Sequence, residues 1–289
     1  MIKRYKAFSL IELSAVLIII AILTTITTQL VSSIKNTQIA NANSITAKAN
    51  ISQIDGLVAW FETSMKQSLN RNETIDNSPI SIWYNIAPES MLDQTNSLET
   101  SPSQHITYKE KGINDLPSID FHGQSNLKLQ SFTNGNINKA TIFIVMSIDT
   151  HNSPTYFDSY NYSNSSVTIL SYDPDQLYIR ASSSGSWTST SSNIPNILTN
   201  RGHIIVTYLN GANSKIYFND AQNIAGGSLI NPGTNPISGL TIGSRSDNNS
   251  NFDGQISEII IFDNILKLPQ RKDVMSYLSK KYNIKVNNL

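Results

Sequence analysis

Two hydrophobic patterns divide the chain. From Phe8 to Val31 only one residue is charged, and neither Pro nor Gly occurs between Ala7 and Asp55. A helix formed by these 24 residues is about 36 Å long, which is enough to span a bilayer. Apolar residues then continue at intervals of three and four, so the pattern predicts one helix over residues 8–55 that stops at Gly56.

The second pattern begins at Gly56. Apolar runs become shorter and rich in β-branched and aromatic residues, and Asn-Gly or Asp-Gly pairs, including Asp253-Gly254, separate several of them. Many short strands without helices between them predict an all-β sandwich, and a short helix beginning near Pro269 closes the chain. The predicted strands cover residues 119–121, 141–148, 167–171, 177–180, 203–209, 215–218, 240–243 and 256–262.

The segment between Met65 and Ser118 has few strand signals and contains four prolines. It predicts long loops on the sandwich, with Trp83 buried. Trp60 and Phe61 follow the predicted helix almost directly, which favours packing at this point over a flexible linker.

Charge and composition exclude several kinds of function. Lys+Arg and Asp+Glu both number 21, and no basic stretch lies beyond residue 6, so nucleic acid is not an expected partner. The chain has no cysteine, which excludes thiolate metal sites and cysteine nucleophiles. Neither a nucleotide-binding motif nor a serine-hydrolase motif occurs, and we expect no enzymatic activity.

The N-terminus carries the most specific chemistry. Lys3, Arg4 and Lys6 precede the apolar run, which keeps this end cytoplasmic and sends the remainder of the chain across the membrane. Glu12 lies near the start of the run, where an isolated carboxylate costs several kcal/mol. A cleaved secretory signal has a shorter apolar region, and a plain anchor gives no reason for this charge. Glu12 therefore indicates a membrane partner.

These residues resemble the type IV prepilin signature, in which a short basic leader ends in a small residue that is followed by Phe and then by Glu as the fifth mature residue. The matching residues in KAFSLIELSAVLIIIAIL are Ala7, Phe8 and Glu12. The resemblance implies that a prepilin peptidase removes residues 1–7 by cleaving between Ala7 and Phe8, and then methylates the Phe8 amine. It also implies that Glu12 of one subunit meets this amine in the next. Ala7 departs from the glycine that is usual before the cleavage point.

The part that follows resembles the laminin-G and concanavalin A-like jelly rolls, and we place this domain at residues 56–286. The resemblance rests on the order of several stretches: GLVAWFETS from Gly56, the predicted hairpin over residues 203–220, and the closing run over residues 239–284. It implies a two-sheet sandwich that binds a glycan or protein ligand. Related glycosidases carry the motif Glu-x-Asp-x-x-Glu, which this sequence lacks.

The candidates for ligand contact are aromatic residues in polar surroundings. Trp187 lies in SSSGSWTSTSS, and Tyr160 and Tyr162 lie in a predicted loop. Trp187 is either an exposed side chain on which a sugar stacks or an inward strand residue, and burial is more common for Trp. Asp247 and Asp253, separated by NNSNF, are candidates for a calcium site, although loops of this composition are more often ordinary turns. Calcium is the only cofactor that the sequence offers.

The sequence thus predicts a type IV pilin-like or pseudopilin-like filament subunit that displays a laminin-G-like head for adhesion, substrate capture or secretion. Its expected partners are the prepilin peptidase, other pilin or pseudopilin subunits and the bacterial inner membrane, with the head in the periplasm or on an extracellular filament. The alternative is a periplasmic carbohydrate-binding protein that is anchored in the inner membrane and never polymerises. Glu12 distinguishes the two, because only packing against a membrane partner requires it.

Overall fold

The computed structural model describes residues 10–65, 67–91, 94–100, 106–123, 125–150, 153–159, 167–171, 176–183, 186–193, 201–227, 231 and 233–289. The chain forms two compact units, which divide between Asn41 and Ala42. The first unit is helical, and the second is a β-sandwich with helices against one of its sheets.

The first unit consists of the N-terminal part of helix α1, which runs from Leu10 to Lys48. Its large apolar side chains up to Ile34 are exposed, and its length and composition are sufficient to cross a membrane. The hydroxyls of Thr24 and Thr25 donate hydrogen bonds to carbonyls one turn earlier in the helix. This back-bonding satisfies the threonine hydroxyls within a continuous helix.

The regular α-helix ends at Lys48, before the predicted end at Asp55. Ala49 has an extended backbone, and a 3-10 turn, Asn50–Gln53, follows it. Packing explains the early end, because Ile51 is buried in the core of the second unit and the chain has to turn to place it there.

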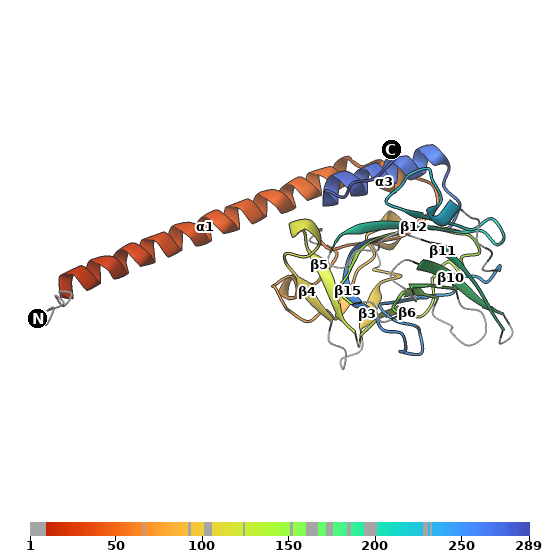
Figure 1. Ribbon diagram of the computed structural model, residues 1–289, viewed down its shortest axis with the longest axis horizontal. Helices are drawn as coiled ribbons and strands as arrows, with labels where there is room; N and C mark the ends of the chain where they lie inside the picture. The colour runs from red at the N-terminus through yellow and green to blue at the C-terminus, as the bar shows by residue number, and fades with distance from the viewer. Residues whose placement is uncertain are drawn as a thin grey trace, which may run out of the picture. The chain divides into compact units, whose positions relative to one another are not determined.

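Two antiparallel sheets form the sandwich, as predicted (Figure 1). The strands of the seven-stranded sheet are β1 (Leu57–Glu62), β4 (Ile106–Lys109), β5 (Ser118–His122), β7 (Ala140–Ile148), β12 (His203–Leu209), β13 (Lys215–Phe218) and β15 (Asp253–Phe262). Their order is β13-β12-β7-β15-β5-β4, and β1 also pairs with β15. We call this sheet the inner sheet, because it has a packed layer on each side.

The strands of the eight-stranded sheet are β2 (Ile82–Trp83), β3 (Leu98–Thr100), β6 (Leu127–Leu129), β8 (Thr155–Asp158), β9 (Val167–Ser171), β10 (Gln176–Ser183), β11 (Ser186–Asn193) and β14 (Leu240–Ile242). Their order is β11-β10-β9-β8-β14-β6-β3-β2. Two further helices complete the fold, α2 (Pro88–Met91) and α3 (Leu268–Tyr282), and short 3-10 turns lie at Arg71–Glu73, Ile113–Asp115 and Ala225–Gly227.

The structure confirms each strand predicted from the apolar runs, together with the closing helix and the burial of Trp83. Two local predictions are wrong. Asp253 and Gly254 do not form a turn; they begin β15, opposite His122 and Phe121. The polar segment between Met65 and Ser118 is also more than loops, because it supplies β2, β3 and β4 at the sheet edges.

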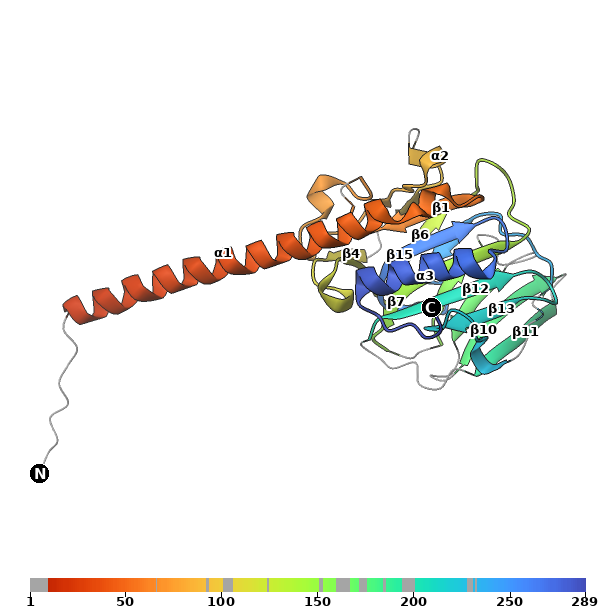
Figure 2. The ribbon, with the colours of Figure 1, turned by 90° about the horizontal axis from the view of Figure 1, so that it is seen from above.

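The inner sheet is covered on both faces. One face packs on the eight-stranded sheet, and the other is covered by α3, which lies across β7, β12 and β15 (Figure 2). Alternate residues of β7 serve the two cores: Ile144 and Met146 face the second sheet, whereas Phe143 and Val145 belong to the core beneath α3. This explains why β7 is apolar at almost every position rather than at every second one.

A buried ionic cluster fastens α3 to the inner sheet. Glu62 and Glu258 lie directly opposite each other on β1 and β15, and both are buried. The Lys281 ammonium lies between them, 2.5 Å from Glu62 Oε1 and 2.9 Å from Glu258 Oε2. Glu62 also accepts hydrogen bonds from the backbone amides of Ser64 and Met65, at 2.8 and 2.7 Å. The ammonium therefore separates two like charges that would otherwise repel each other in a dry site.

Three aromatic donors complete the cluster around Glu258. The indole of Trp60 and the hydroxyl of Tyr277 each donate to Oε1 at 2.7 Å, and the hydroxyl of Tyr282 donates to Oε2 at 2.9 Å. The Tyr277 hydroxyl also lies 3.2 Å from the Thr46 hydroxyl, in the last turns of α1. Burial raises the pKa of Glu258 above its usual value, although Lys281 opposes this shift. One cluster thus joins β1, β15, α3 and the end of α1.

Replacing Lys281 by Met leaves Glu62 and Glu258 facing each other without a counter-charge. We expect the free energy of unfolding of residues 42–289 to fall by about 3–5 kcal/mol, and Glu258→Gln in the same molecule to recover part of this loss. Lys280→Met, on the exposed side of α3, is the matched control and should change the value by less than about 0.5 kcal/mol. Urea denaturation followed by tryptophan fluorescence measures all three variants, and equal effects of the two lysine substitutions would contradict the account.

Candidate functional site

A pocket of about 310 Å³ lies among segments that are far apart in the sequence. We call it the loop pocket. Its lining comes from Val58 on β1, Glu89 and Ser90 on α2, Asn96 before β3, the loop over residues 132–139, and Asp263 after β15.

The loop over residues 132–139 joins β6 to β7 and supplies much of the lining. Phe132 and Ile137 turn inward and are buried, and the backbone of Ile137 forms two hydrogen bonds with that of Ile237, at 2.8 and 2.9 Å. Gly135 has a φ of 91° and donates its amide to the Phe132 carbonyl at 3.2 Å, which closes the turn. These anchors leave three carboxamides exposed on the loop, those of Asn134, Asn136 and Asn138.

Asn96 ties this loop to the segment before β3. Its carboxamide oxygen accepts the Thr133 amide at 2.9 Å, and its nitrogen donates to the Thr133 hydroxyl at 3.2 Å and to the Ser90 hydroxyl at 3.4 Å. The backbone of Asn96 has a φ of 55°, a conformation that Asn adopts more readily than most residues. The wall of the loop pocket is therefore held in place by contacts within the protein itself.

Asp263 is held on the other side of the loop pocket by the chain that enters β1. Its amide donates to the Gly56 carbonyl at 2.8 Å. Gly56 has a φ of 84°, and a Cβ atom at this residue would lie 2.4 Å from Asp263 Oδ1. Glycine favours this backbone conformation, and a Cβ atom here would require the Asp263 side chain to shift.

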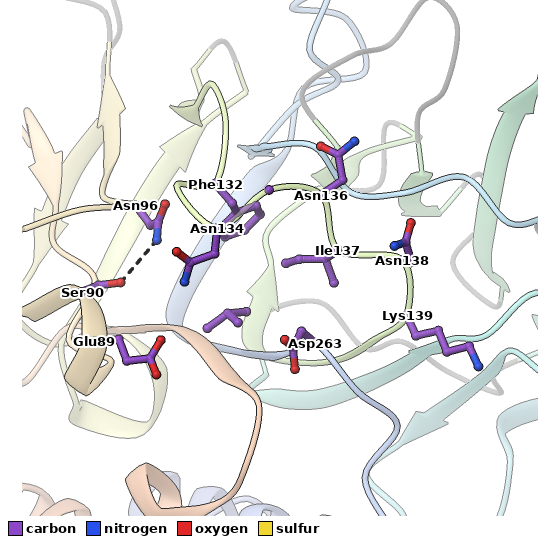
Figure 3. A pocket seen from close by; sticks show the side chains of 12 residues that line it. Glu89, Ser90, Asn96, Phe132, Asn134, Asn136, Ile137, Asn138, Lys139 and Asp263 are labelled. Atoms are coloured by element: carbon purple, nitrogen blue, oxygen red, sulfur yellow. Dashed lines mark hydrogen bonds between the residues drawn. The ribbon is translucent and has the colours of Figure 1, made fainter.

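Most side chains that line the loop pocket are polar, and the apolar ones come from Val58, Phe132 and Ile137. Figure 3 shows the side chains of Glu89, Asn134 and Ile137 directed toward a common space that Asp263 also borders. Within the part of the chain that the structure describes, the side chains of Glu89, Asn134 and Asp263 form no hydrogen bond or ion pair. Their donors and acceptors are therefore available to a ligand.

Neither a known family profile nor a curated protein matches the sequence, but solved structures match the sandwich. Domain 4 of AbnA, an extracellular GH43 arabinanase of Geobacillus stearothermophilus solved with arabinotriose, is 14% identical, with a TM-score of 0.53 over 76% of this chain and 98% of that one. The binding domain of Paraclostridial Mosquitocidal Protein 1 is 14% identical, with a TM-score of 0.55 over 78% of this chain and 53% of that one. Trypanosoma rangeli sialidase in complex with sialic acid is 13% identical, with a TM-score of 0.50 over 78% of this chain and 33% of that one.

At these identities the likeness concerns the fold alone. The chain contains a two-sheet β-sandwich whose fold is similar to that of these domains, and an apolar N-terminal helix precedes it. The predicted fold class is confirmed: a long apolar helix, a sandwich of two antiparallel sheets and a short closing helix.

The residues that the sequence marked for assembly and ligand contact are placed only in part. Ala7, Phe8, Tyr160 and Tyr162 lie outside the described residues. Glu12 lies in the first turn of α1 and is exposed within this chain. The backbone of Trp187 lies in β11 opposite Ser182, and its side chain is outside the described part of the structure. The roles assigned to these residues stay predictions.

The calcium candidates are engaged in local contacts. Asp247 forms an ion pair with Arg245 at 2.7 Å and accepts the Asn249 amide at 3.2 Å, and Asp253 accepts the Thr150 hydroxyl at 2.8 Å. Partial burial by itself raises the pKa of the Asp247 carboxyl. The hydrogen bonds and Arg245 outweigh this effect and lower the pKa below its usual value. Among the described residues, no group of three or more His, Cys, Asp or Glu side chains is arranged to hold a metal ion. Asp247 thus lies in a local turn and Asp253 at the start of β15, and the calcium role stays a prediction.

The loop pocket was not found from the sequence. The available signal was the alternation of carboxamides in FTNGNINK, from Phe132 to Lys139, where the Asn-Gly pair by itself predicts only a turn. Glu89 and Asp263 carry no local signal, because each is an isolated carboxylate outside any recognisable motif.

Asp158, at the end of β8, is a buried carboxylate beside the turn that carries Asp247. Its two oxygens accept the Ser246 amide and the Thr168 hydroxyl, each at 2.8 Å. Burial raises the pKa of Asp158 to about 6, although these hydrogen bonds favour its ionised form. The group therefore titrates in the folded protein well above its ordinary value of 3.8.

Asp158 makes the stability of the sandwich depend on pH. Between its unfolded and folded pKa values the folded protein binds a proton that the unfolded chain releases, so the contribution of Asp158 to stability is lost as pH rises through about 6. We expect the stability of Asp158→Asn relative to the wild type to increase by roughly 2–3 kcal/mol between about pH 4 and pH 8. Thermal melts across this range measure the trend. Asp273→Asn, at an exposed position on α3, is the control, and a pH trend shared by both variants would contradict the assignment.

Proposed function

We propose that this chain is a subunit of a type IV pilin-like filament, either a pilus or a pseudopilus, and that its sandwich displays a ligand-binding surface. The observation that carries the proposal is the N-terminal arrangement of a basic leader, Ala7-Phe8 and a carboxylate at Glu12 inside an otherwise apolar helix.

Free-energy considerations support assembly through this segment. Cleavage before Phe8 creates a cationic amine at the membrane surface, and Glu12 places a carboxylate one helical turn away. Each charge is costly in lipid, and pairing the amine of one subunit with the carboxylate of another removes both costs. The apolar side chains from Leu10 to Ile34 are exposed along the helix and suit packing against membrane or neighbouring helices.

The junction between the helix and the sandwich also supports the proposal. The sandwich unit begins within α1, because Ala42 and Thr46 are buried in the core beneath α3. A filament subunit has to join an assembly segment to a displayed domain, and the two share one helix in this chain.

The displayed domain is proposed to bind rather than to catalyse. Its fold is shared with a domain solved with arabinotriose, which supports a glycan as the ligand class. The sequence lacks the paired carboxylate motif that hydrolysis on such a scaffold uses. The second candidate function is a periplasmic glycan-binding anchor that does not polymerise. Ala7, in place of the usual glycine before the cleavage point, favours this candidate, because slow cleavage would leave the chain anchored without assembling.

The first test concerns processing. If the proposal holds, the mature chain begins at Phe8 with an N-methylated amine, and residues 1–7 are absent. Intact-mass and N-terminal peptide mass spectrometry of the membrane fraction decide this. A chain that retains Met1, or one cleaved beyond Val31, would remove the filament proposal.

The second test separates assembly from anchoring. We expect Glu12→Ala to leave cleavage and membrane insertion intact and to reduce incorporation into filaments at least tenfold, because the variant cannot pair with a neighbouring amine. Ser14→Ala is the control on the same helix, since the Ser14 hydroxyl bonds to the Ile11 carbonyl of its own chain. Quantitative cross-linking in membranes reads out incorporation. Normal incorporation of the Glu12 variant would favour the non-polymerising anchor.

A further inference from the structure

We propose that the loop pocket binds a neutral sugar ring at the end of a glycan, and that Glu89, Asn134 and Asp263 bind its hydroxyl groups. The inference rests on the proposed function and deepens it, because it states where the displayed domain binds and which class of sugar it accepts.

The size of the loop pocket suits one small ligand group. Its volume of about 310 Å³ lies at the lower end of the range for small-molecule sites. An extended peptide or a partner helix needs a long groove, whereas this pocket is closed by the loop over residues 132–139 on one side and by Glu89 and Asp263 on others. A single ring can enter while the remainder of a glycan stays in solvent.

The lining matches the hydrogen-bonding capacity of a sugar. Each sugar hydroxyl both donates and accepts, so adjacent hydroxyls are best bound by carboxylates, which accept, and by carboxamides, which do both. Glu89 and Asp263 supply the carboxylates, and Asn134, on the loop, supplies a carboxamide. Ile137 and Val58 supply apolar lining that can contact the carbon-hydrogen face of the ring.

The charge of the lining selects against acidic sugars. Glu89 and Asp263 both border the space, while the single lysine of the lining, Lys139, extends away from it in Figure 3. A carboxylate, sulfate or phosphate on the ligand would therefore meet like charges in the pocket. Neutral rings avoid this repulsion.

The loop pocket is also built before a ligand arrives. The hydrogen bonds between Asn96 and Thr133 hold the loop, and the Gly56 contact holds Asp263. Binding then requires little ordering of the protein backbone, which preserves affinity.

The test uses the full chain in a detergent without a sugar head group. Saturation-transfer difference NMR and calorimetry with neutral trisaccharides of arabinose, glucose, galactose and mannose give the affinity of the wild type. Lactose and 3′-sialyllactose form a pair that differs by one acidic sugar. We expect binding of at least one neutral oligosaccharide and weaker binding of the sialylated member of the pair.

Three variants locate the site. Glu89→Gln and Asn134→Ala should each weaken binding of the neutral sugar about tenfold, since each removes or weakens hydrogen bonds to a hydroxyl. Asp273→Asn, exposed on α3, should leave binding unchanged. Absence of binding to every neutral sugar, tighter binding of 3′-sialyllactose than of lactose, or equal affinity of the wild type and both pocket variants would overturn the assignment. Cross-linking of the same variants in membranes measures assembly separately from sugar binding. If no sugar binds, the filament proposal is still tested by the Glu12→Ala variant.

Discussion

The fold depends on Lys281, because its ammonium lies between two carboxylates that the pairing of β1 with β15 places directly opposite each other. Glu62 and Glu258 are both buried, so the strand pairing and the position of α3 require each other. Tyr277, from the same helix, extends the contacts to Thr46 in α1. Burial of three charges is unfavourable without complete hydrogen bonding, which Trp60, Tyr277, Tyr282 and the amides after β1 supply. This constraint determines which face of the inner sheet is covered by helices.

Several features of the chain follow from this covered face. β7 and β15 lie between the eight-stranded sheet and α3, so their apolar residues are needed on both sides. The regular part of α1 ends at Lys48 because Ile51 enters the same core. The chain then passes Gly56, whose conformation allows Asp263 to approach and to form one wall of the loop pocket. Packing of the helices on the sheet and formation of the pocket are therefore parts of one arrangement.

The sequence predicted the longer strands and helices well, but it did not predict the contacts between residues that are far apart in the chain. β7 and β12 are strands of nine and seven residues in which most positions are apolar, so each is recognisable by itself. β2 and β3 have two and three residues, too few to show a period, and the Ser- and Thr-rich β11 shows no apolar alternation. Glu62 and Lys281 lie 219 positions apart, so no local pattern connects them. The loop pocket likewise gathers Glu89, Asn134 and Asp263 through the topology of the sheets. Ala7, Phe8 and Glu12 lie within six residues of one another, so a local pattern was enough to suggest a motif there, and its role stays a prediction.

The central claim is that the N-terminal helix packs against other subunits rather than only against lipid. Site-specific photo-cross-linking from Leu13, one residue after Glu12 and exposed on α1, tests this in the native membrane. The account predicts adducts between the N-terminal helices of this chain and those of further copies or of other pilin-like subunits, and it predicts their loss in the Glu12→Ala background. Adducts to lipid alone, unchanged by that substitution, would contradict it.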